Sequence, residues 1–118
     1  MIIRCSVDEL EERLNRILES RPVDGFFAVD EDASLAICKV AKKRGIAVPD
    51  ELSVIGYAGE KLATNVAPGL TTVNQNGVSI GREAARIMLD RIESGNGPYT
   101  KKVIKTTIDR RASTQRKK

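Results

Sequence analysis

Apolar residues follow two different periods along this chain, and segments of the two kinds alternate. Where apolar residues recur every three or four positions, the pattern predicts amphipathic helices, over residues 7–19, 32–44 and 78–93. Short runs of consecutive apolar or β-branched residues predict strands, and the first two runs are typical of strands buried on both faces. These runs cover residues 25–29, 52–57, 70–73 and 103–108.

The residues between these segments match helix boundaries. Ser6 and Glu9 have the spacing of a capping box before the first helix. The acidic run at residues 30–32 is placed to cap the second helix, which ends in basic residues 42–44 followed by Gly45. Helices and strands that alternate at this spacing predict parallel βα units with right-handed crossovers. The predicted fold class is therefore α/β, a parallel sheet flanked by helices.

Composition narrows the class further. The chain has 118 residues, of which 41% are hydrophobic and 31% charged, and this balance is typical of one globular domain. Only 3% are aromatic, so the core must be aliphatic. The net charge is +4, but residues 110–118 hold five basic residues and no acidic one. The rest is close to neutral, so charge gives no sign of a nucleic-acid surface. We expect the basic tail to be frayed and solvated.

Catalytic chemistry has no visible residues in the sequence. Histidine is absent, and Cys5 and Cys38 lack the spacing of metal ligands. Residues 77–81 do not form a phosphate-binding glycine loop. Asp30 could act as a receiver-like phosphoacceptor, but Lys105 is a poor partner for it, and helix capping explains the acidic run equally well. We predict no enzyme activity, no catalytic residue, no cofactor and no metal.

Two further patterns concern location and ligand. No apolar run approaches the roughly 18 residues that span a membrane, and no signal peptide is visible, so we expect a cytoplasmic protein without membrane contact. In open α/β sheets, ligands bind beyond the carboxyl ends of the strands. The loops at residues 29–31 and 57–59 occupy that position, and we expect a small ligand there.

Three stretches of the chain together carry a family signature. They are DGFFAVDEDASLAICKVAKKRGIAVPDELSVIGYAG, PGLTTVNQNGVSIGREAARIMLDRIESG and IDRRAST. They fall in order and cover nearly the whole chain, and they closely resemble the C-terminal half of the effector-binding domain in LacI/GalR transcription regulators. The resemblance implies one subdomain of a type I periplasmic-binding-protein-like fold. It also implies a homodimer that binds a small, sugar-like effector, which controls operator DNA binding allosterically.

The resemblance also implies how the chain is divided. Residues 1–73 and about 103–118 would form the C-terminal subdomain, and about 77–98 would be a helix of the other subdomain. Nothing in the chain matches the rest of that subdomain or the DNA-binding headpiece. We therefore expect a fragment of a longer regulator, one that meets operator DNA only through the missing headpiece. The helix would lack its partner sheet, so we expect it either to pack against a second copy or to be mobile.

Particular residues follow from the same resemblance. Asn74, Gln75 and Asn76 would form one hinge segment between subdomains, and residues 101–105 the other. Dimer contacts would come from Asp32, Ser34 and Val66. Effector contacts would come from Val29, Asp30, Tyr57, Ala58 and Gly77.

Three of the expected effector contacts depart from the family pattern. Related regulators often carry an amide, a carboxylate and an aromatic where this chain has Val29, Ala58 and Gly77. One hypothesis is that the ligand is not held like a simple hexose: it would be an oligosaccharide or a phosphorylated sugar, or be held mainly by the missing half. The other is that Glu31 or Glu60 supplies the acid. A periplasmic sugar-binding protein of a transporter is the alternative function.

Overall fold

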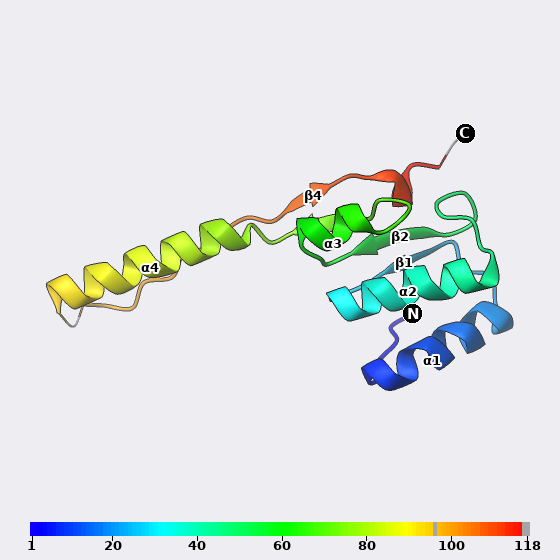
Figure 1. The fold of residues 1–118 in the computed structure, drawn as a ribbon. Coiled ribbons are helices and arrows are strands. Elements are labelled where there is room, and N and C mark those ends of the chain that lie inside the picture. Colours follow the sequence, from blue (N-terminus) through cyan, green and yellow to red (C-terminus); the bar gives the residue numbers. More distant parts are fainter. Residues whose placement is uncertain (96, 117–118) are drawn as a thin grey trace.

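The central feature of the structure, a computed structural model describing residues 1–95 and 97–116, is a sheet of four strands in the order β1-β2-β3-β4 (Figure 1). The strands are β1 (Gly25–Phe27), β2 (Ser53–Gly56), β3 (Thr71–Asn74) and β4 (Thr107–Asp109). The first three run parallel, and β4 is antiparallel to β3. The predicted α/β fold is confirmed, with an antiparallel fourth strand at one edge.

Four α-helices accompany the sheet: α1 (Val7–Ser20), α2 (Glu31–Arg44), α3 (Glu60–Asn65) and α4 (Gly77–Ser94), followed by a short 3-10 helix, η1 (Ala112–Thr114). Helix α1 packs on α2, α2 packs on β2, and α3 packs on β3. The core between them is aliphatic, as the composition predicts. It consists of Leu14, Ala28, Ile37, Val40, Ala41, Leu52, Val54, Ala63 and Leu70.

One glycine allows α2 to lie close to β2. A Cβ atom on Gly56 would lie 2.5 Å from Ser34 Oγ and 2.7 Å from a methyl carbon of Leu70, so no larger residue fits without movement. Ser34 is fully buried at this contact, and its hydroxyl donates to the carbonyl of Asp30 at 2.7 Å. The contact fixes the start of α2 relative to the end of β2, where the predicted ligand loops lie.

Several local expectations differ from the structure. Strand β1 is not buried on both faces: it lies at the sheet edge, and Phe27 is 57% exposed. Ser6 precedes α1 but its side chain makes no capping hydrogen bond. The last strand covers only Thr107–Asp109, and the preceding part of the run predicted at 103–108 has no regular structure. Helix α3 has six residues, too few to show a helical period in the sequence.

The expectation of a frayed basic tail is wrong for residues 110–116, while Lys117 and Lys118 lie outside the described residues. Ser113 is 1% exposed. Its hydroxyl donates to the carbonyl of Val54 on β2 at 2.6 Å and accepts from the backbone N–H of Thr71 on β3 at 2.8 Å. The Arg111 guanidinium donates to Leu70 O and Thr72 Oγ1 at 3.1 and 3.0 Å. We call residues 111–114 the C-terminal latch, because they join the two central strands.

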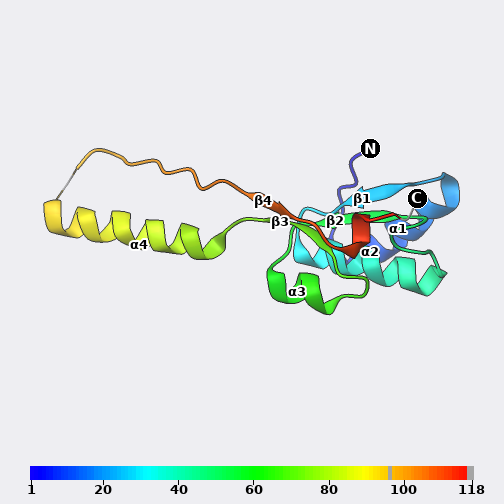
Figure 2. The same ribbon diagram turned by 90° about the horizontal axis from the view of Figure 1, so that it is seen from above.

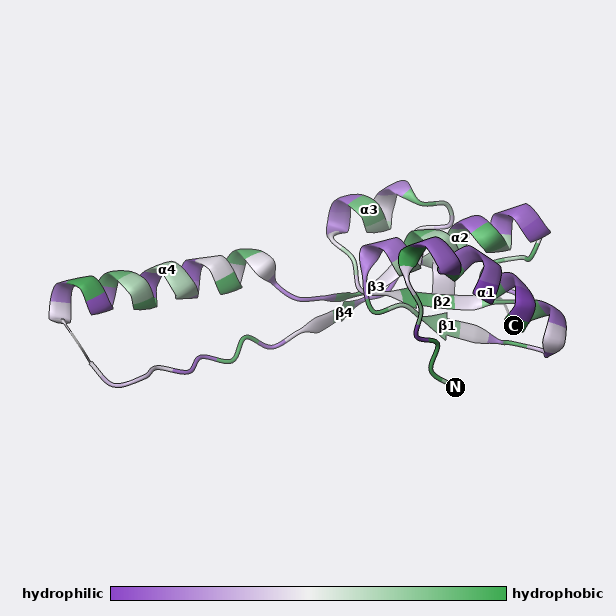
Figure 3. Cartoon of the chain, turned by 90° about the horizontal axis from the view of Figure 1, so that it is seen from below, coloured by the Kyte–Doolittle hydropathy of each residue, from purple (hydrophilic) through white to green (hydrophobic). Residues whose placement is uncertain are grey.

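Helix α4 leaves the body of the molecule and points away from the sheet (Figures 1 and 2). None of its residues is buried, although it carries an apolar stripe that is visible in Figure 3. Val78, Met88 and Ile92 are each more than 60% exposed. The chain then returns along the helix, where residues 100–104 face Ile80, Ala84 and Ile87. In the described residues, α4 therefore has no sheet to cover its stripe.

Replacing Ser113 by Ala is expected to reduce the free energy of unfolding by about 1–3 kcal/mol, since it leaves a buried N–H and a buried carbonyl without a partner. Urea denaturation followed by circular dichroism measures the change. Ser20→Ala, at the exposed end of α1, is the matched control and is expected to cost less than about 0.5 kcal/mol. Equal effects of the two substitutions would contradict the role given to the latch.

Candidate functional site

A cavity of about 390 Å³ lies where the first three strands end. Its walls come from the β1–α2 loop, the β2–α3 loop and the segment that follows β3. All five residues predicted to bind an effector line it, together with four others. The lining residues are Val29, Asp30, Glu31, Tyr57, Ala58, Gly59, Asn74, Gln75 and Gly77. Parallel strands place their carboxyl ends at one edge of the sheet, and this brings the predicted residues together.

Asp30 has two roles at this cavity. It is the N-cap of α2, and its Oδ1 accepts a hydrogen bond from the backbone N–H of Ala33 at 2.7 Å. The sequence predicts this cap. Within residues 1–95 and 97–116, no protein group donates to the second carboxylate oxygen. Asp30 can therefore hold the helix and still offer one acceptor to a ligand.

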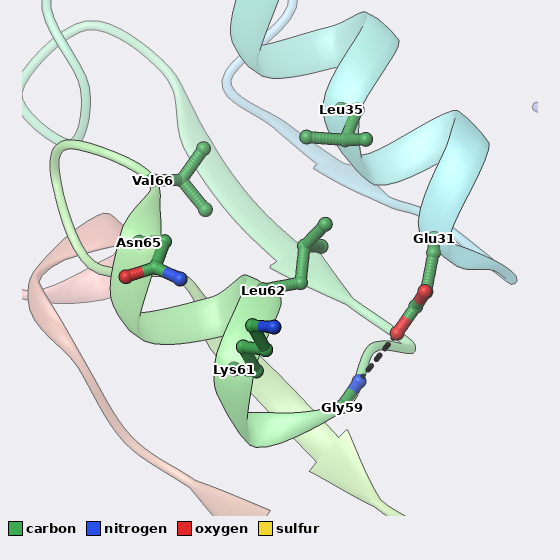
Figure 4. Close-up of a pocket in the computed structure, with 7 residues that line it drawn as sticks. All are labelled: Glu31, Leu35, Gly59, Lys61, Leu62, Asn65 and Val66. Atoms are coloured by element: carbon green, nitrogen blue, oxygen red, sulfur yellow. Dashed lines mark hydrogen bonds between the residues drawn. The ribbon is translucent and has the colours of Figure 1, made fainter.

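Glu31 supplies a second carboxylate to the same wall. Its Oε1 accepts from the backbone N–H of Gly59 at 2.8 Å, which ties the first residue of α2 to the start of α3 (Figure 4). A Cβ atom on Gly59 would lie 3.3 Å from that oxygen, so the close approach favours glycine. The sequence places Glu31 and Gly59 in the two expected ligand loops, and Glu31 is also an alternative source of acid, but their hydrogen bond to each other is not predicted. Two signals point to Glu31: the acidic run at residues 30–32 and its position directly after a predicted strand.

The predicted hinge residues are held by side-chain hydrogen bonds. Asn74 donates to Asp109 Oδ2 at 3.0 Å and accepts from the backbone N–H of Asn76 at 2.8 Å. Asn76 has a left-handed backbone, with φ of 54°, and its amide donates to the carbonyl of Lys105 at 2.7 Å. The two segments predicted to cross between subdomains therefore lie side by side. Asn74 belongs both to this crossing and to the cavity wall.

A second depression, of about 440 Å³, lies between α2 and α3 on the other side of Glu31 (Figure 4). Glu31, Leu35, Gly59, Lys61, Leu62, Asn65 and Val66 line this α2–α3 groove. Of the predicted dimer residues, Val66 lies in the groove and Asp32 is exposed at the start of α2. Ser34 is fully buried against Gly56, so its side chain cannot contact a partner and that part of the prediction is wrong.

Residues 1–95 and 97–116 contain no group of three or more His, Cys, Asp or Glu side chains placed to hold a metal ion. In the same part of the chain, no helix is both long enough and apolar enough to cross a membrane. The Cys38 thiol is partly buried, and this burial raises its pKa, so it favours the protonated form.

The chain belongs to the family of periplasmic binding protein-like domains, which matches residues 3–114. Relatives of known function belong to a narrower class, the transcription regulators. The HTH-type transcriptional regulator CelR of Thermobifida fusca is 33% identical over 96 residues, and the ribose operon repressor of Halalkalibacterium halodurans is 32% identical over 88 residues. These alignments cover 80% and 74% of this chain but only 28% and 27% of the relatives. The chain thus spans less than a third of their length.

Solved structures agree with these relatives. A transcriptional regulator CelR–cellobiose complex matches with a TM-score of 0.80 and 30% identity, over 92% of this chain and 33% of that one. A LacI family regulator from Bifidobacterium animalis subsp. lactis matches with a TM-score of 0.79 and 25% identity, over 94% of this chain and 41% of that one. The resemblance to the effector-binding domain of LacI/GalR regulators is confirmed.

Asn76→Gly tests the contact between the two crossing segments. Glycine accepts the left-handed backbone, so the substitution removes only the amide that holds the Lys105 carbonyl. We expect limited trypsin digestion to cleave the bond after Lys105 several times faster, as measured by mass spectrometry of the fragments. Asn65→Gly, at the exposed end of α3, is the control and should leave that rate unchanged. An unchanged rate in Asn76→Gly would show that the two segments do not depend on this bond.

Proposed function

We propose that this chain is the C-terminal part of the effector-binding domain of a LacI-type transcriptional regulator. A small, sugar-like ligand binds in the cavity at the strand ends and controls operator DNA binding by a headpiece elsewhere in the parent protein. The observation that carries the proposal is that Val29, Asp30, Tyr57, Ala58 and Gly77 line one cavity. The CelR structure, a complex with cellobiose, supports a sugar as the ligand class.

The division into subdomains is part of the proposal. Residues 1–73 and about 103–116 form one lobe, and α4 belongs to the other lobe of the parent protein. Two observations support this: α4 has no buried residue, and it leaves the sheet directly after Asn76. The exposed apolar stripe is the surface that the other lobe would cover, because a stripe of this size is unusual on an isolated soluble domain.

The crossing segments give the proposed mechanism its physical basis. A ligand that contacts both lobes favours the closed arrangement, and its differential affinity for the closed state sets how far the lobes shift. Rotation about a few residues at element ends is a common form of such closure. Asn74, Gln75 and Asn76 act as the hinge on one side, and the segment near Lys105 acts on the other. A bound ligand beside Asn74 is thereby coupled to the angle between the lobes.

A regulator fits better than the alternatives. The relatives described above are a transcriptional regulator and an operon repressor. We therefore propose a protein without catalytic activity that works in the cytoplasm. In this proposal, sequence-specific DNA contact is made only by the headpiece, because reading a DNA sequence requires side chains that reach base edges in a groove.

Titrating the isotope-labelled protein with cellobiose tests the proposed site. We expect the backbone amide signals of Ala58, Gly59 and Gly77 to shift in the NMR spectrum. Gly77→Phe should tighten binding several-fold, since an aromatic ring adds roughly 1 kcal/mol of contact with the sugar. A Cβ atom at Gly77 meets nothing within 4 Å, so a side chain can begin there without a clash.

Gly81→Phe is the matched control, because a Cβ atom there also meets open space one turn further along α4. It should leave the affinity for cellobiose unchanged. Shifts confined to residues away from the cavity, or equal effects of the two phenylalanines, would contradict the proposed site.

We also propose that the α2–α3 groove is the dimer contact. Leu35 is 41% exposed in the groove, and Leu62 and Val66 extend the same apolar surface. The resemblance to LacI/GalR regulators implies dimer contacts on this face, which supports the proposal. Asp32 lies at its edge, at the start of α2, and can contribute a polar contact at the rim.

Leu35→Glu is expected to convert the dimer into a monomer, because it places a charge beside Leu62 and Val66 on a surface that the dimer would bury. Size-exclusion chromatography with light scattering measures the molar mass. Met88→Glu is the matched control on the exposed stripe of α4 and should leave a dimer. If Met88→Glu dissociates the protein and Leu35→Glu does not, α4 is the interface instead of the groove.

A further inference from the structure

The geometry points to a ligand that carries no negative charge where it meets this wall: an uncharged sugar or an amino sugar, and not a phosphorylated or acidic one. This inference rests on the proposed function and assigns the ligand class of that same cavity. It decides between hypotheses that the sequence leaves open, since a phosphorylated sugar is one of them.

The charged side chains in the wall of the cavity are acidic. Asp30 and Glu31 both line the cavity, and the other lining residues are apolar or neutral. None of the described lining residues is Lys or Arg. Lys61 is the basic residue of the neighbouring α2–α3 groove, which Glu31 separates from the cavity. An anionic group in the cavity would therefore face two carboxylates with no compensating cation from this wall.

Several backbone N–H groups near the cavity already have partners within the protein. The start of a helix usually binds anions, because its first N–H groups have no partner and the helix dipole is positive there. At this cavity, side chains of the protein already accept from three backbone N–H groups at or beside helix starts. The N–H of Ala33 donates to Asp30 at 2.7 Å, and the N–H of Gly59 donates to Glu31 at 2.8 Å. The N–H of Asn76 donates to Asn74, also at 2.8 Å. These three N–H groups are used internally and are not free to bind a phosphate.

What remains for a ligand is a set of acceptors beside an apolar surface. Each carboxylate uses one oxygen for the backbone N–H and keeps the other, and an ionised carboxylate only accepts hydrogen bonds. Sugar hydroxyls and the ammonium group of an amino sugar are donors that match them. Val29 and Ala58 can contact the C–H face of a sugar ring, as apolar residues in sugar pockets do. The ammonium group forms the stronger bond because it is charge-assisted.

The test is an NMR titration of the 118-residue protein at constant ionic strength with D-glucose, D-glucosamine and D-glucose 6-phosphate. The amide signals of Gly59 and Ala33 report on the two carboxylates. We expect glucose and glucosamine to shift them, with glucosamine binding more tightly, and glucose 6-phosphate to leave them unchanged. Shifts by glucose 6-phosphate at equal or lower concentration than glucose would overturn the inference and leave the proposed function standing.

Glu31→Gln removes the charge of this side chain and keeps nearly the same shape. Glutamine keeps an oxygen that can accept from Gly59, but it removes one negative charge from the cavity. We expect glucosamine to bind about tenfold more weakly, as when a charge-assisted bond becomes a neutral one, with glucose little affected. Glu93→Gln, an exposed residue on α4, changes the net charge equally and should leave all three affinities unchanged.

The outcomes separate the two levels of the proposal. If the two substitutions have equal effects on glucosamine, the preference comes from overall charge and the inference fails. If none of the three sugars, nor cellobiose, shifts a signal of the cavity, the proposed function itself fails. Weaker glucosamine binding in Glu31→Gln but not in Glu93→Gln, together with an unaltered response to glucose, supports the inference.

Discussion

The hydroxyl of Ser113 is the contact on which the arrangement of the sheet depends. Strands β2 and β3 pair from Ile55 and Thr71 onward, so the carbonyl of Val54 and the N–H of Thr71 lie at the start of their ladder. Both belong to buried residues, and a buried backbone group without a partner is costly. One hydroxyl satisfies both groups at 2.6 and 2.8 Å. The spacing of the two central strands, and hence of the loops that follow them, is fixed at this point.

Strand β3 and the residues after it connect the C-terminal latch to the cavity and then to the hinge. Thr71 meets the latch, Asn74 lines the cavity, and Asn76 holds the neighbouring segment through Lys105. Arg111 adds a second connection, because it contacts Thr72 and lies 3.8 Å from Asp109, the partner of Asn74. Through Asn74, the cavity wall is thus hydrogen-bonded to Asp109 in the sheet and to Asn76 in the hinge segment.

The sequence predicts the parts of this molecule that depend on local patterns. The three long helices have a clear apolar period, and Asp30 and Gly45 mark the ends of α2 through side-chain and backbone preferences that act within one turn. The five cavity residues were placed by a rule about strand ends and by the family resemblance. Neither the strand-end rule nor the family resemblance depends on contacts between distant segments of this chain.

What the sequence does not predict depends on such distant contacts. The basic tail looks solvated from its charge, yet Arg111 bonds Thr72 on β3, 39 residues earlier, and Ser113 bonds Val54 on β2, 59 residues earlier. Phe27 belongs to an apolar run, but its exposure depends on β1 being an edge strand. Glu31 resembles a helix-start acid, and its bond to Gly59 arises only because α2 and α3 begin at the same place.

The order in which the latch and the sheet are joined has a consequence for synthesis. Thr71 leaves the ribosome 42 residues before the Ser113 hydroxyl to which its N–H donates. Between them the chain makes the whole excursion through α4 and back. Strands β2 and β3 can therefore pair early in synthesis. The hydrogen bonds of Ser113 at the start of their ladder form only after α4 has been synthesised. Until residues 111–114 are available, the N–H of Thr71 lacks its Ser113 partner, so this end of the β2–β3 ladder is completed late in synthesis.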